Sequence, residues 1–439
     1  MRLDFLEEVV AVLGFDEVAW LMNTKEKVEE TVVSKHLSDI KSATSVCGKN
    51  TVLLALALRN RVLCLKFQRK EGRGFEVRAR HEHRAACAVT SLLWIRLDFQ
   101  AEENWMLVLG GEDGVVWFLD REFRFIYKSQ VHASPVLSIR AHNLGMGIRK
   151  ETTSQGITIT FKDVVVLLSV EELLHMHQNM KTGQRTLYDD IDFAKYDLSS
   201  AISGMTDAVT VGYTSFSLRQ LLMGTSWESK KRKIRVLACG VDPALLCVHV
   251  EKNQNANPNP LLSTALELVP LPFVSRLTKK IAGTRNKEED AQMFSSKVPF
   301  VDPNRHVFSL TLAPDYPLVA CCDSLGRVLV IDATNFVVKK VFKGYRDAAT
   351  GWLYSLQTRK LYLIILSPKR LRVEVWDVFE GKPMKHLECK QGDFLCKPAC
   401  AILIKPSTED TLDESCILKA SLGSEGLRLS MIKLIYEPM

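Results

Sequence analysis

Two pairs of histidines are the residues of this sequence whose spacing most readily suggests metal chemistry. His81 and His83 precede Cys87, and His175 and His177 form the second pair. Side chains at i and i+2 of a strand share one face, so each pair could direct two imidazoles at one ion. Zinc sites need two further ligands at short spacing, and neither pair has them nearby. We therefore predict no metal site.

The sequence also lacks the common motifs of covalent catalysis and of nucleotide binding. The sequence has no G-x-S-x-G nucleophile elbow and no phosphate-binding G-x-x-x-x-G-K-[ST] loop. The glycines of 110–114 suit a hairpin turn, the acids of 188–192 suit a solvated loop as well as Ca²⁺, and the basic run 230–233 suits a strand entrance as well as phosphate. Cys389, Cys396 and Cys400 lack C-x-x-C spacing. We predict no catalytic residue, no cofactor and no enzymatic activity.

The stretch 342–352, with the sequence FKGYRDAATGW, is the candidate for partner contact. It combines two glycines, an acid–base pair and the large aromatics Tyr345 and Trp352. One explanation is a corner between neighbouring sheets, in which the aromatics fill a gap and Arg346 pairs with Asp347. The other is contact with a partner protein, for which the candidate residues are Lys343, Gly344, Tyr345, Arg346, Asp347 and Trp352.

A second candidate segment lies in the largest interruption of the strand pattern, residues 251–306. Phe273, Leu277 and Ile281 are four residues apart and would share one face of a helix, whose other positions are basic. Such a helix can lie on an anionic membrane surface, or it can cover the rim of the fold, which is the interpretation we prefer. The candidates for membrane contact are Phe273, Arg276, Leu277, Lys279 and Lys280.

Composition limits the class of protein. The chain has 439 residues and a formal net charge of +7, which permits contact with anionic lipid or an acidic partner but does not predict nucleic-acid binding. No window approaches the roughly 18 apolar residues that span a bilayer. The first residues lack the features of a secretory signal, and eleven scattered cysteines are expected to be reduced thiols. These features predict a soluble, intracellular protein.

Apolar hairpins recur along the chain and would position any of these candidates. The clearest, Leu318–Ile331, turns at 323–326 and returns as a strand that is apolar on both faces. Such a strand must be covered on both sides, as it is in a β-propeller. Trp376-Asp377 ends another strand, in the manner of the WD dipeptide of WD40 repeats. We predict an all-β, WD40-like propeller of about seven blades from seven hairpins, the other six being 52–67, 105–119, 157–170, 234–250, 361–378 and 416–435.

The region before the first hairpin, residues 1–44, is expected to be helical. Its apolar residues recur at helical spacing, namely Leu3, Leu6, Val9, Val10 and Leu13. Residues 45–439 are expected to form the propeller, with 251–306 as an insertion. A doubly wound α/β fold would need a helix between successive strands, and a helical solenoid would need sustained helical periodicity. The sequence offers neither.

Two motifs lie together in residues 323–352: a D-x-x-G-R-V-x-x-x-D hairpin, followed by K-G-Y-R-D-A-x-x-G-W. This string closely resembles the N-terminal domain of the regulatory, non-catalytic subunit of the Rab-three GTPase-activating complex. Further stretches similar to the family occur in the same order along the chain, at 89–92, 104–118, 135–139, 194–196, 206–212, 274–278 and 367–376. The stretch 194–196 departs from the family in one position, because Tyr196 follows Lys195 where the family usually has tryptophan.

The resemblance implies an interaction protein. In that family the subunit has no catalytic arginine, and it forms a heterodimer with a separate Rab-GAP catalytic subunit. The heterodimer acts on Rab GTPases as a GTPase activator and as a nucleotide-exchange factor, in vesicle trafficking and autophagy. The resemblance also implies a cytoplasmic location, extending to peripheral contact with endoplasmic reticulum membranes.

The resemblance leaves two matters open. Family members continue into a long, mostly helical C-terminal region, whereas this sequence ends at Met439. It therefore represents either a divergent short member or a truncated product, and functions that need the helical region are expected to be affected. The alternative function is a WD40-like scaffold of a trafficking coat or tether with no GTPase role.

Overall fold

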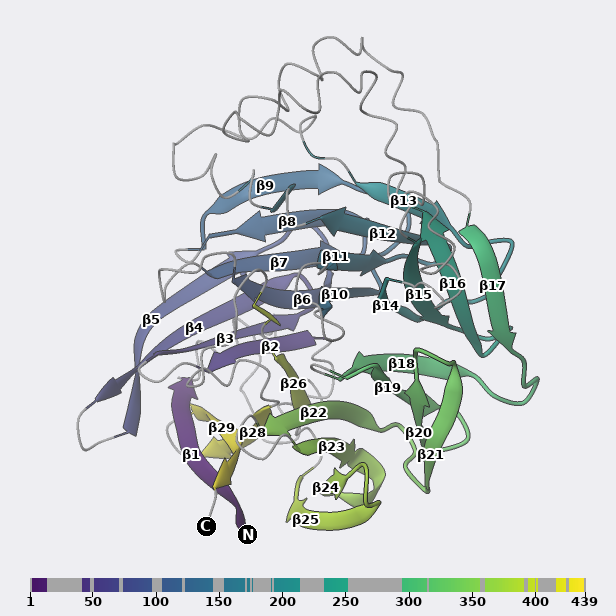
Figure 1. Cartoon of the computed structure of the whole chain (residues 1–439). Helices are drawn as coiled ribbons and strands as arrows, with labels where there is room; N and C mark the ends of the chain where they lie inside the picture. The colour runs from purple at the N-terminus through teal and green to yellow at the C-terminus, as the bar shows by residue number, and fades with distance from the viewer. Residues whose placement is uncertain are drawn as a thin grey trace, which may run out of the picture.

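The protein is an all-β propeller in which strands are grouped around a central axis (Figure 1). The computed structural model describes residues 2–13, 42–47, 51–70, 74–96, 105–120, 123–144, 154–169, 172–173, 176, 191, 193–213, 233–251, 294–313, 316–355, 360–390, 394–398, 400–401, 416–423 and 426–437. Helix is nearly absent from these residues, and the one helical element with defined bounds is a 3-10 turn, η2, at Pro368–Arg370.

Four sheets contain four strands each, which follow one another along the chain. In Figure 1, β10, β14, β18 and β22 lie near the axis and β13, β17, β21 and β25 lie at the periphery. The first two sheets are β10 (Ser138–Leu144), β11 (Ser154–Thr160), β12 (Val164–Ser169) and β13 (Ala194–Asp197), then β14 (Asp207–Tyr213), β15 (Lys233–Cys239), β16 (Leu245–Glu251) and β17 (Phe294–Phe300). The other two are β18 (Val307–Leu312), β19 (Leu318–Asp323), β20 (Arg327–Asp332) and β21 (Val337–Lys343), then β22 (Ala349–Ser355), β23 (Lys360–Ser367), β24 (Arg372–Asp377) and β25 (Lys382–Glu388).

The remaining two sheets bring together segments from distant parts of the chain. One has five strands, β27 (Cys400–Ala401), β6 (Val89–Arg96), β7 (Trp105–Gly111), β8 (Val115–Leu119) and β9 (Phe125–Gln130). The other has eight, β1 (Arg2–Leu13), β29 (Gly426–Glu437), β28 (Cys416–Gly423), β26 (Phe394–Pro398), β2 (Ser42–Cys47), β3 (Thr51–Leu58), β4 (Arg61–Lys70) and β5 (Gly74–Arg84). Figure 1 shows both chain ends beside β1 and β29.

The described strands form six blades rather than about seven, which corrects the expected number. Each of the seven predicted hairpins is present as an antiparallel pair of strands. Two of these hairpins, β3–β4 and β28–β29, belong to the same eight-stranded sheet, because β2 pairs in parallel with β26. This junction is short, with Thr44 opposite Lys397 and Ser45 opposite Pro398. Two hairpins therefore share one blade.

The expectation of a helical segment at 1–44 is wrong for its first part, because residues 2–13 form strand β1. This strand pairs antiparallel with β29, from Arg2 opposite Glu437 to Leu13 opposite Leu427. The physical reason is that the apolar residues of this segment fit a period of two as well as a helical period, and β29 provides backbone hydrogen-bond partners along its length. The even spacings are those of Leu3, Phe5, Val9, Ala11 and Leu13. Residues 14–41 of the expected helix, and most of the insertion 251–306, lie outside the described residues.

The hairpin β19–β20 shows why the strands are apolar on both faces. Val319 and Cys321 belong to an apolar cluster shared with blade β14–β17, whereas Ala320 and Cys322 belong to a cluster shared with blade β22–β25. All four side chains are fully buried. The expectation that this hairpin lies between two other sheets is therefore confirmed.

Gly114, in the turn between β7 and β8, provides a test of how tightly the turns pack. Its φ is +77°, and a Cβ there would lie 2.0 Å from the carbonyl oxygen of His132. We expect Gly114→Ala to lower the free energy of unfolding by about 2–3 kcal/mol, because both the strained backbone and the neighbouring backbone must shift. Urea denaturation measures this change.

Gly381→Ala is the matched control for that substitution. Its φ is +71°, but the atom that its Cβ would meet, at 2.5 Å, is Nζ of Lys340, the far end of a flexible side chain. We expect a loss of about 1 kcal/mol from backbone strain alone. Equal losses for the two variants would contradict the role assigned to the backbone contact at His132.

Candidate partner-binding surface

The corner loop, residues 343–348, carries the chain from the outer strand β21 to the inner strand β22 of the next blade. The backbone N–H groups of Gly344 and Tyr345 both donate to the carbonyl of Gly326, at 2.9 and 2.7 Å, which ties the loop to the β19–β20 turn. Gly344 has a φ of +86°, and a Cβ there would lie 2.3 Å from Nη2 of Arg370. The loop therefore touches turns of its own blade and of the next one.

Tyr345 is buried between the two blades. Its O–H donates to the carboxylate of Glu374 on β24, and the guanidinium of Arg370 lies 4.7 Å from its ring centre. The indole N–H of Trp376 donates to the same carboxylate at 3.2 Å. Burial, followed by the hydrogen bond to Glu374 and its negative charge, raises the pKa of Tyr345. The phenol therefore stays protonated and remains a hydrogen-bond donor.

Trp352 is also an interior side chain. It lies on the inner strand β22, is 2% exposed, and donates its indole N–H to the carbonyl of Thr311 on the inner strand β18 at 2.9 Å. At the other end of the stretch, Phe342 packs on Trp376 with ring centres 5.0 Å apart. Trp352 and Phe342 are buried and Trp376 is half-buried, and together these aromatic residues pack in the apolar cluster shared by neighbouring blades.

Three of the six candidate partner-contact residues present their side chains to solvent: Lys343, Arg346 and Asp347 are exposed. Asp347 has a φ of +56° and forms an ion pair with Lys369 of the next blade, with 3.6 Å between Oδ2 and Nζ. The acid of this stretch therefore pairs across the blade boundary, rather than with Arg346 as one interpretation of the sequence expected. Gly344 is exposed but has no side chain, and the buried Tyr345 and Trp352 support the surface from beneath.

The candidates for membrane contact cannot be placed in the same way. Phe273, Arg276, Leu277, Lys279 and Lys280 lie outside the described residues. Within the described part of the chain, no helix has the length and apolar character needed to cross a membrane.

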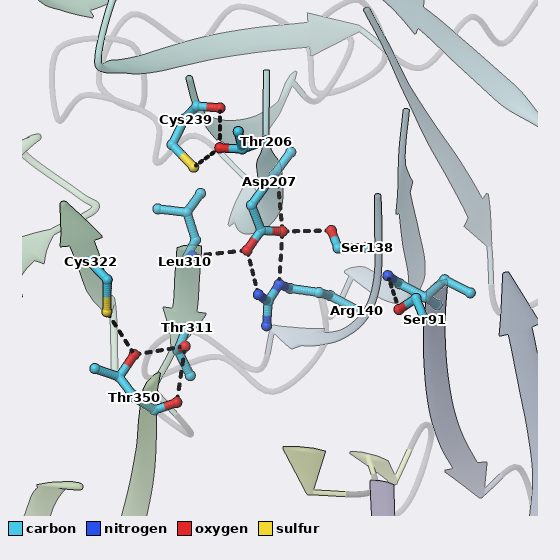
Figure 2. Close-up of polar contacts among 12 residues, drawn as sticks. Ser91, Ser138, Arg140, Thr206, Asp207, Cys239, Leu310, Thr311, Cys322 and Thr350 are labelled. Atoms are coloured by element: carbon cyan, nitrogen blue, oxygen red, sulfur yellow. Dashed lines mark hydrogen bonds and ion pairs between the residues drawn. The ribbon is translucent and has the colours of Figure 1, made fainter. Parts of the chain in front are cut away.

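At the axis, Asp207 joins the inner strands of three consecutive blades (Figure 2). Its carboxylate accepts hydrogen bonds from the O–H of Ser138 and from Nε and Nη2 of Arg140, both on β10. It also accepts the backbone N–H of Leu310 on β18 at 2.9 Å and that of Ala208 on its own strand at 3.0 Å. One buried carboxylate thus serves β10, β14 and β18 together.

The charges of this axial cluster stabilise each other. Burial alone would raise the pKa of Asp207, but the Arg140 guanidinium and the hydrogen bonds it receives outweigh burial and lower that pKa below its usual value. Burial alone would lower the pKa of Arg140, but Asp207 outweighs it and raises that pKa. Both groups therefore stay charged inside the propeller, and buried ion pairs of this kind depend on both partners.

Neutral hydroxyl pairs continue the inter-blade contacts near the axis. Thr158 on β11 and Thr210 on β14 lie 2.7 Å apart through their hydroxyl oxygens, and Thr311 on β18 and Thr350 on β22 lie 3.0 Å apart. Ser91 on β6 accepts the backbone N–H of Ile139 at 2.9 Å. Figure 2 shows the contacts of Ser91 and of the Thr311–Thr350 pair. The centre of the ring is therefore held together by polar groups as well as by apolar packing.

Sequence reasoning gave no role of its own to Asp207, Arg140 or Glu374. A local signal existed for Asp207, because an acid opens an otherwise apolar strand, and a buried acid requires partners. The partners themselves could not be read from the sequence, because Arg140 and Leu310 are 67 and 103 residues away.

The residues considered for metal chemistry have other contacts. The His81 ring packs on Phe123 at 4.5 Å and the His83 ring on Phe125 at 4.7 Å between centres, while His175 and His177 lie outside the described residues. Nowhere in the described ranges do three His, Cys, Asp or Glu side chains gather in a way that could hold a metal ion. The seven cysteines whose state is described are free, and burial raises the pKa of Cys322 to about 12.

Comparisons with known proteins give a family and a fold. The family model described as "Rab3 GTPase-activating protein regulatory subunit N-terminus" matches residues 36–395. A Rab3 GTPase-activating protein regulatory subunit of Caenorhabditis elegans is 39% identical over 72 residues, which cover 16% of this chain and only 6% of that relative. The crystal structure of BBS1N in complex with ARL6DN superposes with a TM-score of 0.51 at 9% identity, covering 91% of this chain and 93% of that one. The last likeness supports the propeller fold alone.

Proposed function

Because the chain belongs to the family defined by the N-terminus of the Rab3 GTPase-activating protein regulatory subunit, we propose that it is the regulatory, non-catalytic component of a heterodimeric complex that acts on a Rab GTPase. The observation that carries this proposal is the family match over residues 36–395, which includes the four four-stranded blades in full and most strands of the other two. The propeller supplies a rigid docking surface for a catalytic subunit and for the Rab protein.

The chemistry of the described residues suits a docking role. GTPase activation needs an arginine that neutralises the charge developing on the transferred phosphate, and in the proposed complex the catalytic subunit supplies it. Arg346 and Lys343 are exposed on the corner loop beside Asp347, where they would contact a partner protein. Gly344, Tyr345 and Trp352 keep the corner in the shape that the contact requires.

The proposed setting is vesicle trafficking and autophagy on the cytoplasmic side of endoplasmic reticulum membranes, and the complex would act there as an activator or as an exchange factor. We also propose that residues Phe273, Arg276, Leu277, Lys279 and Lys280 contribute peripheral membrane contact. This part rests on the amphipathic pattern of the sequence.

Co-purification tests the proposal. We expect the tagged 439-residue chain to retain a Rab-GAP catalytic subunit at near-equal stoichiometry. We also expect the isolated chain to add nothing to the rate of GTP hydrolysis by the Rab protein, whereas the assembled complex raises it. Recovery of coat or tether components without the catalytic subunit would favour a trafficking scaffold instead, and GTP hydrolysis stimulated by the isolated chain would contradict a non-catalytic role.

A further inference from the structure

Three loops of blades β18–β21 and β22–β25 gather most of the net charge of the chain on one surface. They are residues 324–327, 343–348 and 368–372, and we call this surface the basic loop face. The three loops contain one acid, Asp347, against the six basic residues Arg327, Lys343, Arg346, Lys369, Arg370 and Arg372. Their formal charge of +5 compares with +7 for the whole sequence.

The three loops are in direct contact, so the charges belong to one surface. Gly326 of the first loop accepts two backbone N–H groups of the second, at 2.9 and 2.7 Å. The second loop touches the third twice, through the Asp347–Lys369 ion pair at 3.6 Å and through Arg370, whose guanidinium lies 4.7 Å from the Tyr345 ring centre. The blade boundary therefore runs beneath the face and does not divide it.

The acids within and beneath the basic loop face neutralise little of its positive charge. The Asp347–Lys369 pair is 70% and 67% exposed, and exposed pairs of this kind contribute about 0–1 kcal/mol. Glu374 lies 3.9 Å from Arg370 but is buried beneath the face. Lys343, Arg346 and Arg372 are exposed, and among the ion pairs of the described residues none involves them.

Apolar side chains and backbone strain accompany the charge. Leu325 and Leu371, each at the tip of a tight turn, are 43% and 46% exposed. Leu371 has a φ of +54° and Asp347 a φ of +56°, two of the five non-glycine residues with positive φ in the described ranges. Such conformations cost about 1 kcal/mol or more each. At Leu371 the left-handed backbone closes the 3-10 turn η2 and holds the side chain at the exposed tip of that turn.

We infer that the basic loop face binds an acidic, partly apolar polypeptide segment of a partner protein. Carboxylates of the segment pair with the arginines, and its apolar side chains cover Leu325 and Leu371. The inference rests on the proposed function only for the identity of the protein that carries the segment.

A polypeptide ligand accounts better than a membrane surface for the high share of arginine among the basic residues. Four of the six basic residues are arginines, whose planar guanidinium binds carboxylates in a bidentate manner. A membrane surface attracts lysine and arginine about equally through their charge. Arg370 is held in place by the Tyr345 ring and Glu374, and a pre-positioned group loses less conformational entropy on binding.

The test uses Arg346→Glu/Arg372→Glu, which reverses two exposed charges of the face. The matched control is Lys128→Glu/Lys195→Glu, the same charge change on exposed residues of β9 and β13. The first probe is the purified Rab-GAP catalytic subunit, and the second is a labelled peptide in which glutamates alternate with leucines. The third is a vesicle that contains phosphatidylserine.

We expect the face variant to bind the catalytic subunit at least tenfold more weakly than the wild type and the control. We also expect it to lose both the peptide binding and the salt dependence of that binding. Unchanged affinity of the variant for both protein probes would overturn the inference while leaving the proposed function intact. A wild type that ignores the catalytic subunit but binds the peptide through this face would instead refute the proposed function alone. Binding to vesicles and not to the peptide would show that the face binds lipid, and it would overturn the inference that its ligand is a polypeptide.

Discussion

Replacing Asp207 by asparagine is expected to lower the free energy of unfolding by about 3–5 kcal/mol, the usual cost of removing one partner of a buried ion pair. The substitution leaves the Arg140 guanidinium inside the propeller without its counter-charge. The new amide keeps one acceptor oxygen, and in either orientation its NH2 group would face a donor of Arg140, which now bonds both carboxylate oxygens. Urea denaturation followed by fluorescence measures the loss.

Asp332→Asn is the matched control. Asp332 lies at the end of β20, where its carboxylate accepts the backbone N–H of Thr334 at 2.9 Å and pairs with the exposed Lys339 at 3.5 Å. Asparagine keeps an acceptor for the turn, and an exposed ion pair contributes little, so we expect a loss below about 1 kcal/mol. If the Asp207 and Asp332 variants were equally stable, Asp207 could not be the group that joins three blades.

The effect of Asp207 also has a predicted pH dependence. Its pKa in the folded state lies below its ordinary value, and the unfolded value is about 3.9. A depressed pKa in the folded state stabilises the fold fully above the unfolded value, and this contribution is lost as pH falls through the folded value. The stability difference between the wild type and Asp207→Asn should therefore be constant from pH 7 to about pH 5 and shrink below about pH 4. A difference that grew on acidification would contradict the assignment.

The hairpins were predictable because their signal is local. Each strand of β19–β20 is apolar on both faces, and Gly326 marks the turn between them, so neighbouring residues alone indicate a sheet covered on both sides. The blade number and the first strand were not predictable in this way. They depend on the β2–β26 and β1–β29 pairings, which join residues from opposite ends of the chain.

The candidate surface was predictable in composition and not in arrangement. The sequence placed Tyr345, Arg346 and Asp347 together, but it could not show that Tyr345 points inward, because the group that receives its O–H, Glu374, is 29 residues away. The basic loop face was hidden for the same reason, since its three loops come from two blades. Charge that is scattered in the sequence becomes a patch only when the blades are stacked.

Replacing Tyr345 by alanine is expected to lower the free energy of unfolding by about 3–5 kcal/mol, as for other buried aromatics. The substitution leaves a cavity between two blades, takes the O–H donor from the buried carboxylate of Glu374, and removes the ring over which Arg370 lies. Tyr345→Phe keeps the ring and loses only the donor, so we expect a loss of about 1–2 kcal/mol. Thermal and urea denaturation rank the two variants, and an equal loss would mean that the ring adds nothing to the hydrogen bond.

Arg346→Ala separates shape from contact at the same corner. Arg346 is adjacent to Tyr345 in the chain but exposed, so its removal should change stability by no more than about 0.5 kcal/mol. If the corner recognises a partner through its exposed charges, Arg346→Ala weakens binding while the fold remains as stable as the wild type. Tyr345→Phe, in contrast, keeps the ring over which Arg370 lies. It should therefore weaken binding only to the extent that the loss of the hydroxyl displaces Arg370. Two outcomes would contradict these roles: unfolding of the protein by Arg346→Ala, and unchanged stability of Tyr345→Ala. Stability would then depend on the exposed side chain and not on the buried one.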